Sequence, residues 1–263
     1  MSSDIKAIPD VSGPAAAPPR IEWRVARVTD VRDETPRART LVLDVPQWPG
    51  HQAGQHVDVR LVAEDGYQAQ RSYSIASPPE ERTVSLTVER LEDGEVSPYL
   101  CDVLRVGDGL EVRGPIGGYF VWTTTVGGPL LLVAGGSGIA PLMAILRHHA
   151  LAEPSARAAV PVRLIYSARS PDDVIYRAEL EDLTDPPLVD VLITLTREAP
   201  PTWTGHRRRI DRAMLEMMSW PPSAAPQIFV CGPTMLVESV ATLLVDLGHD
   251  ASHVRTERFG PTG

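Results

Sequence analysis

The hydrophobic and polar positions of the chain follow one pattern up to about residue 123 and a different pattern after it. In the first part, short runs alternate apolar with polar residues between clusters of Gly, Pro and Asp, which is typical of half-buried antiparallel strands. The expected strands lie within residues 21–32, 39–45, 55–62, 70–79, 83–91 and 109–115. One helix is expected over 97–104, with Ser97 as its N-cap and Pro98 in its first position. This part of the sequence predicts an antiparallel barrel or sandwich.

In the second part, unbroken apolar runs alternate with segments of helical periodicity. The expected strands are 130–134, 162–168, 188–196 and 227–232, and the expected helices are 141–152, 173–183, 210–218 and 234–248. Strands that are apolar on both faces, each followed by a helix, indicate a parallel sheet covered on both sides. The predicted fold class is therefore a β-barrel followed by a doubly wound parallel α/β domain.

The length of 263 residues supports this division into two domains. We place a barrel domain at 21–123, an α/β domain at 124–263 and a disordered lead-in at 1–20, which is rich in Ala and Pro. The longest apolar runs are far shorter than the roughly 20 residues that span a bilayer, so no membrane insertion is expected. The lead-in also lacks the apolar core of a signal peptide, and we expect a cytoplasmic protein.

Charge and cysteine content exclude several classes of function. The net charge of −9 argues against nucleic-acid binding, which needs a basic face. The chain has two cysteines, Cys101 and Cys231, whereas an all-cysteine iron–sulfur site needs four thiolates. We therefore expect no metal site in this chain and assign any cluster to a partner. The basic stretch 205–212, GHRRRIDR, is either a solvated loop or an anion site.

A glycine-rich turn joins the first predicted parallel strand to its helix in LLLVAGGSGIAPLMAIL. Gly135, Gly136 and Gly138 let the backbone approach a ligand closely, and the helix that starts near Pro141 offers free N–H groups to a diphosphate. The glycines are also explained if the turn needs them for its geometry alone. Since Pro141 stands where a third glycine of the dinucleotide fingerprint would be, the motif is only a partial match.

The fourth predicted strand ends in CGPTM and repeats this arrangement with Gly232, Pro233 and Thr234. Two such turns at the carboxyl edge of one parallel sheet converge on the crevice where ligands of open α/β folds bind. Cys231 ends a buried strand, and a cysteine in that position is more often part of the core than of the chemistry.

Arginines end the second and third predicted parallel strands, where an acidic residue would indicate NAD. Arg169 and Arg197 hold these positions, and planar guanidinium groups suit a phosphate, so NADP is favoured. Asp172 and Asp173 lie nearby and leave NAD open, because either carboxylate can bind a ribose hydroxyl.

The stretch QRSYSIASPP puts a cation, an aromatic ring and a hydroxyl on one predicted barrel strand. Arg71 offers charge to a diphosphate, Tyr73 a ring to a flat cofactor, and Ser74 a hydroxyl to a ring nitrogen. Downstream, the turn at Gly94 and the helix opening at Ser97 form a second position that can hold a diphosphate. The alternative is a barrel edge on which Arg71 and Tyr73 are merely exposed.

Together these segments resemble the ferredoxin–NADP reductase superfamily, in which a flavin-binding barrel is joined to a pyridine-nucleotide domain. The resemblance covers residues 21 to about 260 and rests on five signatures in order, namely RSYS, GEVS, GPIGGYF, GGSGIAP and CGPTM. It implies FAD and NADP(H) as cofactors, with NAD(H) possible. Many oxygenase reductases of this superfamily carry a four-cysteine ferredoxin domain, and the printed sequence contains none.

The resemblance also implies roles for individual residues. The expected catalytic residues are Ser74, near the reactive flavin nitrogen, Cys231, near the reacting nicotinamide carbon, and Glu257. The residues expected to bind flavin are Arg71, Ser72, Tyr73, Ser74, Val88, Glu89, Arg90, Gly94, Val96, Ser97 and Phe259. Of these, Val88, Glu89 and Arg90 are expected to contribute through their backbone. The residues expected to bind the nicotinamide nucleotide are Gly135, Gly136, Ser137, Gly138, Pro141, Arg169, Arg197, Cys231, Gly232, Pro233 and Thr234. Plant-type members end in an aromatic residue stacked on the flavin, whereas this chain continues for four residues after Phe259.

The resulting hypothesis is a flavin-dependent NADPH dehydrogenase that hands electrons to a separate protein, either ferredoxin-like or a metalloenzyme. A flavin or quinone reductase that reduces a small molecule is the second hypothesis. The third is an electron-transfer subunit of a larger complex, or a nucleotide-sensing module. The sequence leaves the acceptor and the oligomeric state open.

Overall fold

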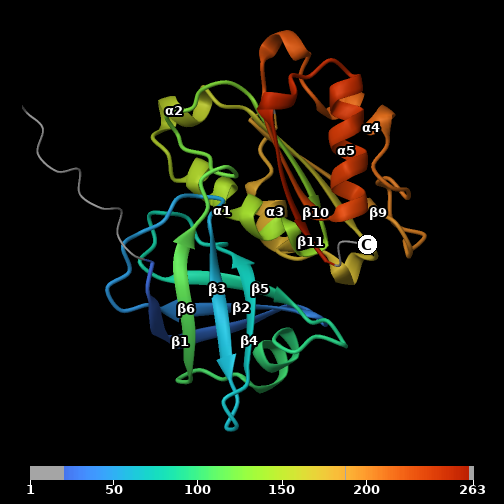
Figure 1. Cartoon of the computed structure of the whole chain (residues 1–263). Coiled ribbons are helices and arrows are strands. Elements are labelled where there is room, and N and C mark those ends of the chain that lie inside the picture. Colours follow the sequence, from blue (N-terminus) through green and yellow to red (C-terminus); the bar gives the residue numbers. More distant parts are fainter. Residues whose placement is uncertain (1–20, 187, 261–263) are drawn as a thin grey trace, which may run out of the picture.

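A computed structural model of the protein describes residues 21–186 and 188–260. The predicted lead-in, 1–20, lies outside the described residues. The described chain forms an antiparallel barrel followed by a parallel sheet with helices on both faces, which confirms the predicted fold class (Figure 1). None of the helices described is long and apolar enough to cross a membrane.

The barrel has six strands in the spatial order β4-β3-β6-β1-β2-β5. They are β1 (Trp23–Thr35), β2 (Ala38–Asp44), β3 (His56–Val62), β4 (Gln68–Ser74), β5 (Val84–Glu89) and β6 (Gly109–Ile116). A bridge between Ile75 and Leu86 closes the two edges, and the Ala76 N–H donates to the Ser85 carbonyl at 2.8 Å. Closure leaves few unpaired strand edges, and alternate side chains such as Leu41 and Leu43 fill the interior.

The helix expected in the barrel domain is present as the short π-helix η1 (Tyr99–Val103), but its predicted cap is wrong. The Ser97 hydroxyl accepts a hydrogen bond from the Leu91 N–H at 3.0 Å instead of capping the helix. The turn at Gly94 brings these residues together, because a Cβ on Gly94 would lie 2.8 Å from Ser97 Oγ. Ser97 therefore stabilises the turn that precedes the helix.

The parallel sheet has five strands in the order β11-β10-β7-β8-β9. From β7 the chain adds β8 and β9 on one side and β10 and β11 on the other, so the strand order reverses between β7 and β10 as in doubly wound folds. The strands are β7 (Leu130–Gly135), β8 (Val162–Ala168), β9 (Val189–Leu195), β10 (Gln227–Pro233) and β11 (Val254–Phe259). The α-helices are α1 (Ile139–Ala150), α2 (Pro154–Ala158), α3 (Arg177–Leu183), α4 (Arg212–Met218) and α5 (Thr234–Asp246). The short 3₁₀ turns are η2 (Gly136–Gly138), η3 (Pro171–Asp173), η4 (Pro222–Ala224) and η5 (Ala251–His253).

Two details of this domain differ from the sequence prediction. Strand β11 was not expected, and helix α3 begins at Arg177 rather than at 173. Tyr176 has a left-handed backbone conformation, with φ of 59°, which interrupts the helical pattern just before α3. Its buried ring lies under the Arg147 guanidinium, and its hydroxyl hydrogen-bonds Thr87 of the barrel. The contact between the domains therefore sets where this helix begins.

Helices α1 and α3 lie between the parallel sheet and the barrel, while α4 and α5 cover the opposite face of the sheet (Figure 1). The hydrophobic core around α1 continues into barrel residues, including Ala76, Phe120 and Trp122. Arg147 of α1 also donates to the Ala76 carbonyl at 2.7 Å. The two domains are thus packed against each other on this side, which fixes the geometry of the cavity between them.

Candidate functional site

A cavity of about 900 Å³ lies between the barrel and the carboxyl edge of the parallel sheet. It falls within the range of about 300–1,000 Å³ that is usual for small-molecule and cofactor sites. The predicted site residues on its wall are Arg71, Ser72, Tyr73, Ser74, Glu89, Gly94, Val96, Ser97, Gly135, Gly136, Ser137, Arg169, Arg197, Pro233 and Phe259. Segments far apart in the sequence therefore meet at one site.

The remaining predicted residues are not among those that line the cavity. They are Val88, Arg90, Gly138, Pro141, Cys231, Gly232, Thr234 and Glu257. Val88 is part of the barrel core, and Pro141 is buried within α1. The Arg90 side chain pairs with Asp102 at 2.7 Å, away from the cavity wall. Their assigned roles in binding or catalysis stay predictions.

The barrel side of the cavity presents side chains from β4. The Arg71 guanidinium is 55% exposed and contacts Glu95 of the neighbouring turn at 3.0 Å. Tyr73 packs against the barrel core while also reaching the cavity, and burial raises the pKa of its phenol. The Ser72 hydroxyl instead donates to Asp58 at 2.7 Å, on the other face of the strand. Charge and an aromatic ring therefore reach the cavity from alternate positions of one strand.

Next to β7 and β10 the sheet side presents glycine backbone, whereas its far end carries arginine side chains. A Cβ on Gly138 would lie 2.3 Å from the Cys231 carbonyl oxygen, and one on Gly232 would lie 3.1 Å from the Gly135 nitrogen. These glycines let the turn after β7 pack directly on β10, so the geometric explanation applies to them. Gly136 differs, because its φ of 54° lies in the left-handed region that favours glycine, and a Cβ there would lie 3.4 Å from Glu89 Oε2 of the barrel.

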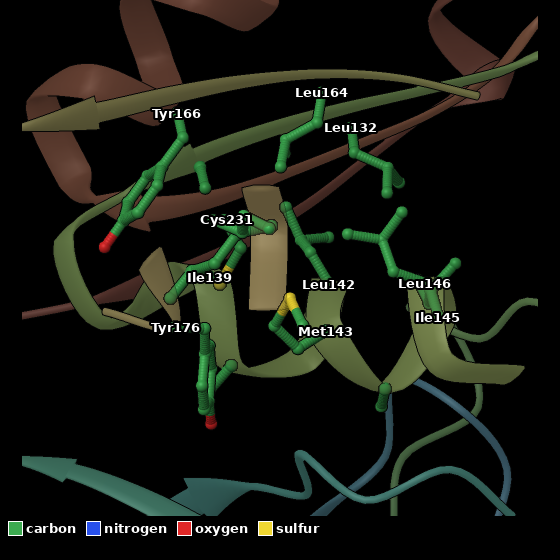
Figure 2. Packing of buried hydrophobic residues seen from close by; sticks show 14 of the residues in the cluster. Leu132, Ile139, Leu142, Met143, Ile145, Leu146, Leu164, Tyr166, Tyr176 and Cys231 are labelled. Carbon is green, nitrogen blue, oxygen red and sulfur yellow. The ribbon is translucent and has the colours of Figure 1, made fainter. Parts of the chain in front are cut away.

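Cys231 and Glu257 are neighbours in the register of β10 and β11, where Cys231 is buried and Glu257 is partly buried. Figure 2 shows Cys231 among apolar side chains that pack on α1, beside Ile139 and Leu142. Burial and the nearby Glu257 carboxylate raise the pKa of its thiol. Burial also raises the pKa of Glu257 to about 7 from an ordinary value of 4.5. Glu257 can therefore exchange a proton near neutral pH, whereas Cys231 stays a neutral thiol.

Three arginines surround the far end of the cavity, where β8 and β9 terminate. Arg169 and Arg197 are held side by side because the Arg197 N–H donates to the Arg169 carbonyl at 2.9 Å. Among the arginines of the basic stretch 205–212, Arg209 is the one that lines the described cavity wall. Arg207 instead donates to the Trp203 carbonyl at 2.8 Å, and Arg208 pairs with Asp211. This end of the cavity suits an anionic group.

Arg37 on the hairpin between β1 and β2 was missed by the sequence analysis. Its guanidinium lies 3.0 Å from Asp173 and 3.6 Å from Glu89, so it joins the two domains at the cavity. Arg37 lies in the charged run ETPRART, which looks like any exposed hairpin. Since its partner Asp173 is 136 residues away, no local signal was available to find this contact.

Comparison with known proteins matches both halves of the chain. The sequence profile of the oxidoreductase FAD-binding domain matches residues 25–121. The profile of the oxidoreductase NAD-binding domain matches residues 132–242. The chain is 34% identical over 245 residues to ferredoxin–NADP reductase B of Sorangium cellulosum, covering 89% of this chain and 96% of that protein.

A second relative is the glycine betaine monooxygenase reductase subunit of Chromohalobacter salexigens, which is 36% identical over 242 residues. That match covers 90% of this chain but 64% of the relative, so the chain spans less than two thirds of its length. Among solved structures, a ferredoxin NADP+ reductase from Neisseria gonorrhoeae with bound FAD and NADP superposes with a TM-score of 0.76 at 21% identity, covering 91% of this chain and 99% of that one. That likeness supports the fold.

The barrel carries the profile of an oxidoreductase FAD-binding domain and the doubly wound part that of an oxidoreductase NAD-binding domain, with the cavity between them. The chain belongs to the ferredoxin–NADP reductase family, as its RSYS, GGSGIAP and CGPTM segments predicted.

Proposed function

We propose that the protein is an FAD-dependent NAD(P)H reductase that takes hydride from NADPH and passes electrons to a separate carrier protein. The observation that carries this proposal is that the RSYS strand and the glycine-rich turn line one and the same cavity of about 900 Å³. A site of this kind brings two cofactors together, one bound by each domain. The domain limits of 21–123 and 124–263 belong to the same proposal.

The barrel wall fits FAD. The partly exposed Arg71 guanidinium and the turn Gly94–Ser97 would hold the diphosphate, and the Tyr73 ring would lie against the flat ring system. The turn is already closed by the Ser97 hydroxyl, which accepts from the Leu91 N–H at 3.0 Å. When bound, FAD accepts two electrons as hydride and can release them one at a time.

The sheet wall fits a nicotinamide nucleotide. The turn at Gly136 and the start of α1 would receive the diphosphate, and the arginines at the ends of β8 and β9 would receive the additional phosphate of NADP. This arrangement favours NADPH over NADH. Asp173 does not offer a free carboxylate to a ribose, because it accepts from Ser170 at 2.7 Å and from Arg37 at 3.0 Å.

Three residues would act near the reacting atoms. Ser74 lies on the cavity wall at the end of β4, where its hydroxyl would orient the flavin ring. Glu257, with its pKa of about 7, would hold or release a proton at the edge of the site. Cys231 would shape the floor behind the nicotinamide, since its buried thiol stays protonated. None of these roles needs a metal ion.

The named relatives support a protein as the electron acceptor. One is a reductase subunit of a monooxygenase, and another is a ferredoxin–NADP reductase. By analogy, the partner of this chain would be a ferredoxin-like protein or a metalloenzyme. The cytoplasmic location expected from the sequence stays a prediction that cell fractionation tests.

The test is steady-state turnover of the FAD-loaded protein with NADPH and a choice of acceptors. The proposal expects a ferredoxin-type protein to be reduced with a higher kcat/KM than free flavin or a quinone. Faster reduction of the small molecules would support the flavin or quinone reductase instead. No NADPH-dependent reduction of any acceptor would leave an electron-transfer subunit or a nucleotide-sensing module.

A further inference from the structure

The Glu89 carboxylate reaches from the barrel into the part of the cavity that belongs to the other domain. Glu89 is the last residue of β5, and its side chain is 20% exposed on the cavity wall. Its Oε1 lies 3.6 Å from Arg37 Nη2 and 4.0 Å from Arg169 Nη1. Both separations are longer than a hydrogen bond, so the two arginines lie near the carboxylate without donating hydrogen bonds to it.

The same carboxylate lies against the glycine-rich turn. A Cβ added to Gly136 would be 3.4 Å from Glu89 Oε2, an ordinary van der Waals distance, so the carboxylate lies beside this turn. Gly136 opens the turn Gly136–Gly138 that leads directly into α1, a helix of 12 residues. Helix N-termini favour anions, and the turn beside the Glu89 carboxylate leads into one.

The surroundings of Glu89 are those of a phosphate subsite, with a glycine turn that leads into a helix and the Arg37 guanidinium, while the more distant Arg169 lies toward the additional phosphate of NADP. A phosphate of the nucleotide and the Glu89 carboxylate cannot share this space, because both are anions. On the basis of the proposed function, we propose that Glu89 occupies the subsite for the nucleotide diphosphate and must be displaced when NADP(H) binds. Glu89 is thus a built-in competitor that lowers nucleotide affinity.

Displacement of Glu89 leaves the rest of the subsite in place. Arg37 keeps its contact with Asp173 at 3.0 Å, so its guanidinium stays at the cavity after the carboxylate leaves. The Glu89 side chain has a solvent-exposed direction to move into, since it is partly exposed. The competition is electrostatic, and salt screens it over a Debye length of about 10 Å at 0.1 M.

The test compares the FAD-loaded wild type with Glu89→Gln, which keeps the shape and removes the charge. Dissociation constants are measured by calorimetry for NADP+ and for 2′-AMP, which carries the additional phosphate but no diphosphate. We expect Glu89→Gln to bind NADP+ about fivefold more tightly at low ionic strength, an effect that shrinks at high salt. Because Glu89 also lies 4.0 Å from Arg169, 2′-AMP should bind more tightly too, but by a smaller factor than NADP+.

The matched control is Glu198→Gln, which removes an exposed carboxylate beside Arg197 that is not on the cavity wall. It should leave both constants within twofold. NADP+ affinity that is unchanged or weaker in Glu89→Gln overturns the inference, and weaker binding would make Glu89 a ligand of the nucleotide. Equal tightening of NADP+ and 2′-AMP also overturns it, because the carboxylate would then act as a general charge. A wild type that holds FAD but fails to bind NADP+ rejects the proposed function itself.

Discussion

The two walls of the cavity are built in opposite ways. The barrel wall presents side chains, such as the 55% exposed Arg71 and the half-buried Tyr73. Next to β7 and β10 the sheet wall presents backbone, because a Cβ on Gly138 or Gly232 would lie within 3.1 Å of backbone atoms of the neighbouring segment. A motif on the barrel therefore identifies groups that contact a ligand. A glycine motif on the sheet identifies positions where backbone segments pack closely, and this packing shapes the cavity that the ligand occupies.

The largest effect expected from this difference is on the sheet side. Gly138→Ala should lower the free energy of unfolding by about 3 kcal/mol or more, because its Cβ would lie 2.3 Å from a backbone oxygen that cannot move alone. Urea unfolding measures the change. The control is Gly127→Ala, whose Cβ meets nothing within 4 Å and should alter stability by less than about 0.5 kcal/mol. Equal stability of the two variants would mean that Gly138 is not a packing residue.

The next effect concerns the pH dependence of stability, which depends on the partly buried Glu257. Burial raises its pKa from 4.5 to about 7, so folding favours the neutral carboxyl. Its contribution to stability is full below pH 4.5 and is lost as the pH rises through about 7. Glu257→Gln should therefore be more stable than the wild type at pH 8 by about 2 kcal/mol, allowing for partial exposure.

Thermal unfolding from pH 4.5 to pH 8 measures this contribution. The variant should show a flatter stability profile than the wild type, and the exposed Glu22→Gln should keep the wild-type profile. A profile for Glu257→Gln that parallels the wild type would show that this carboxyl is not the group that titrates.

On the barrel side, the expected effect is on the ligand rather than on the fold. Arg71→Ala should weaken FAD binding about tenfold, because one charge-assisted hydrogen bond to the ligand is lost. The free energy of unfolding should change little, because the Arg71 side chain is exposed. Bound FAD per protein after dialysis measures the loss. Arg90→Ala should retain FAD, because its side chain pairs with Asp102 away from the wall. Full flavin content in Arg71→Ala would contradict the assignment.

The smallest effect expected is on the choice of nucleotide. Arg169→Ala and Arg197→Ala should each raise the KM for NADPH about fivefold and leave the KM for NADH nearly unchanged. The effect is modest because each guanidinium is partly exposed and would contact only the additional phosphate of NADPH. Steady-state kinetics with both nucleotides measures the ratio. Arg207→Ala is the control, since that guanidinium donates to backbone carbonyls. Equal changes for NADH and NADPH would indicate a structural role for the arginines.

The sequence predicted most of the elements because each one carries a local pattern. Alternation revealed the barrel strands, and unbroken apolar runs revealed β7, β8 and β10. Strand β11 was missed because, in VRTERF, only Val254 is fully buried and the polar residues hide the strand. The order of the strands and the closure through Ile75 and Leu86 depend on distant pairings that no local pattern records.

The site was predicted in part for the same reason. The RSYS segment carries its chemistry in four adjacent residues, whereas the cluster of Arg37, Glu89 and Asp173 is assembled by the docking of two domains. The sequence also did not reveal that the Cys231 side chain packs in the core rather than lining the cavity, because a position at a strand end does not indicate toward which face of the sheet its side chain points. Residues that depend on tertiary contact are the ones that the sequence analysis missed.

The central claim is that FAD and NADPH bind in one cavity and react there. Anaerobic addition of NADPH to the FAD-loaded protein, followed by absorption of the flavin band, tests it most directly. The account predicts loss of that band with one equivalent of NADPH per FAD, and a larger excess of NADH for the same loss. A flavin band that persists with excess NADPH would contradict it.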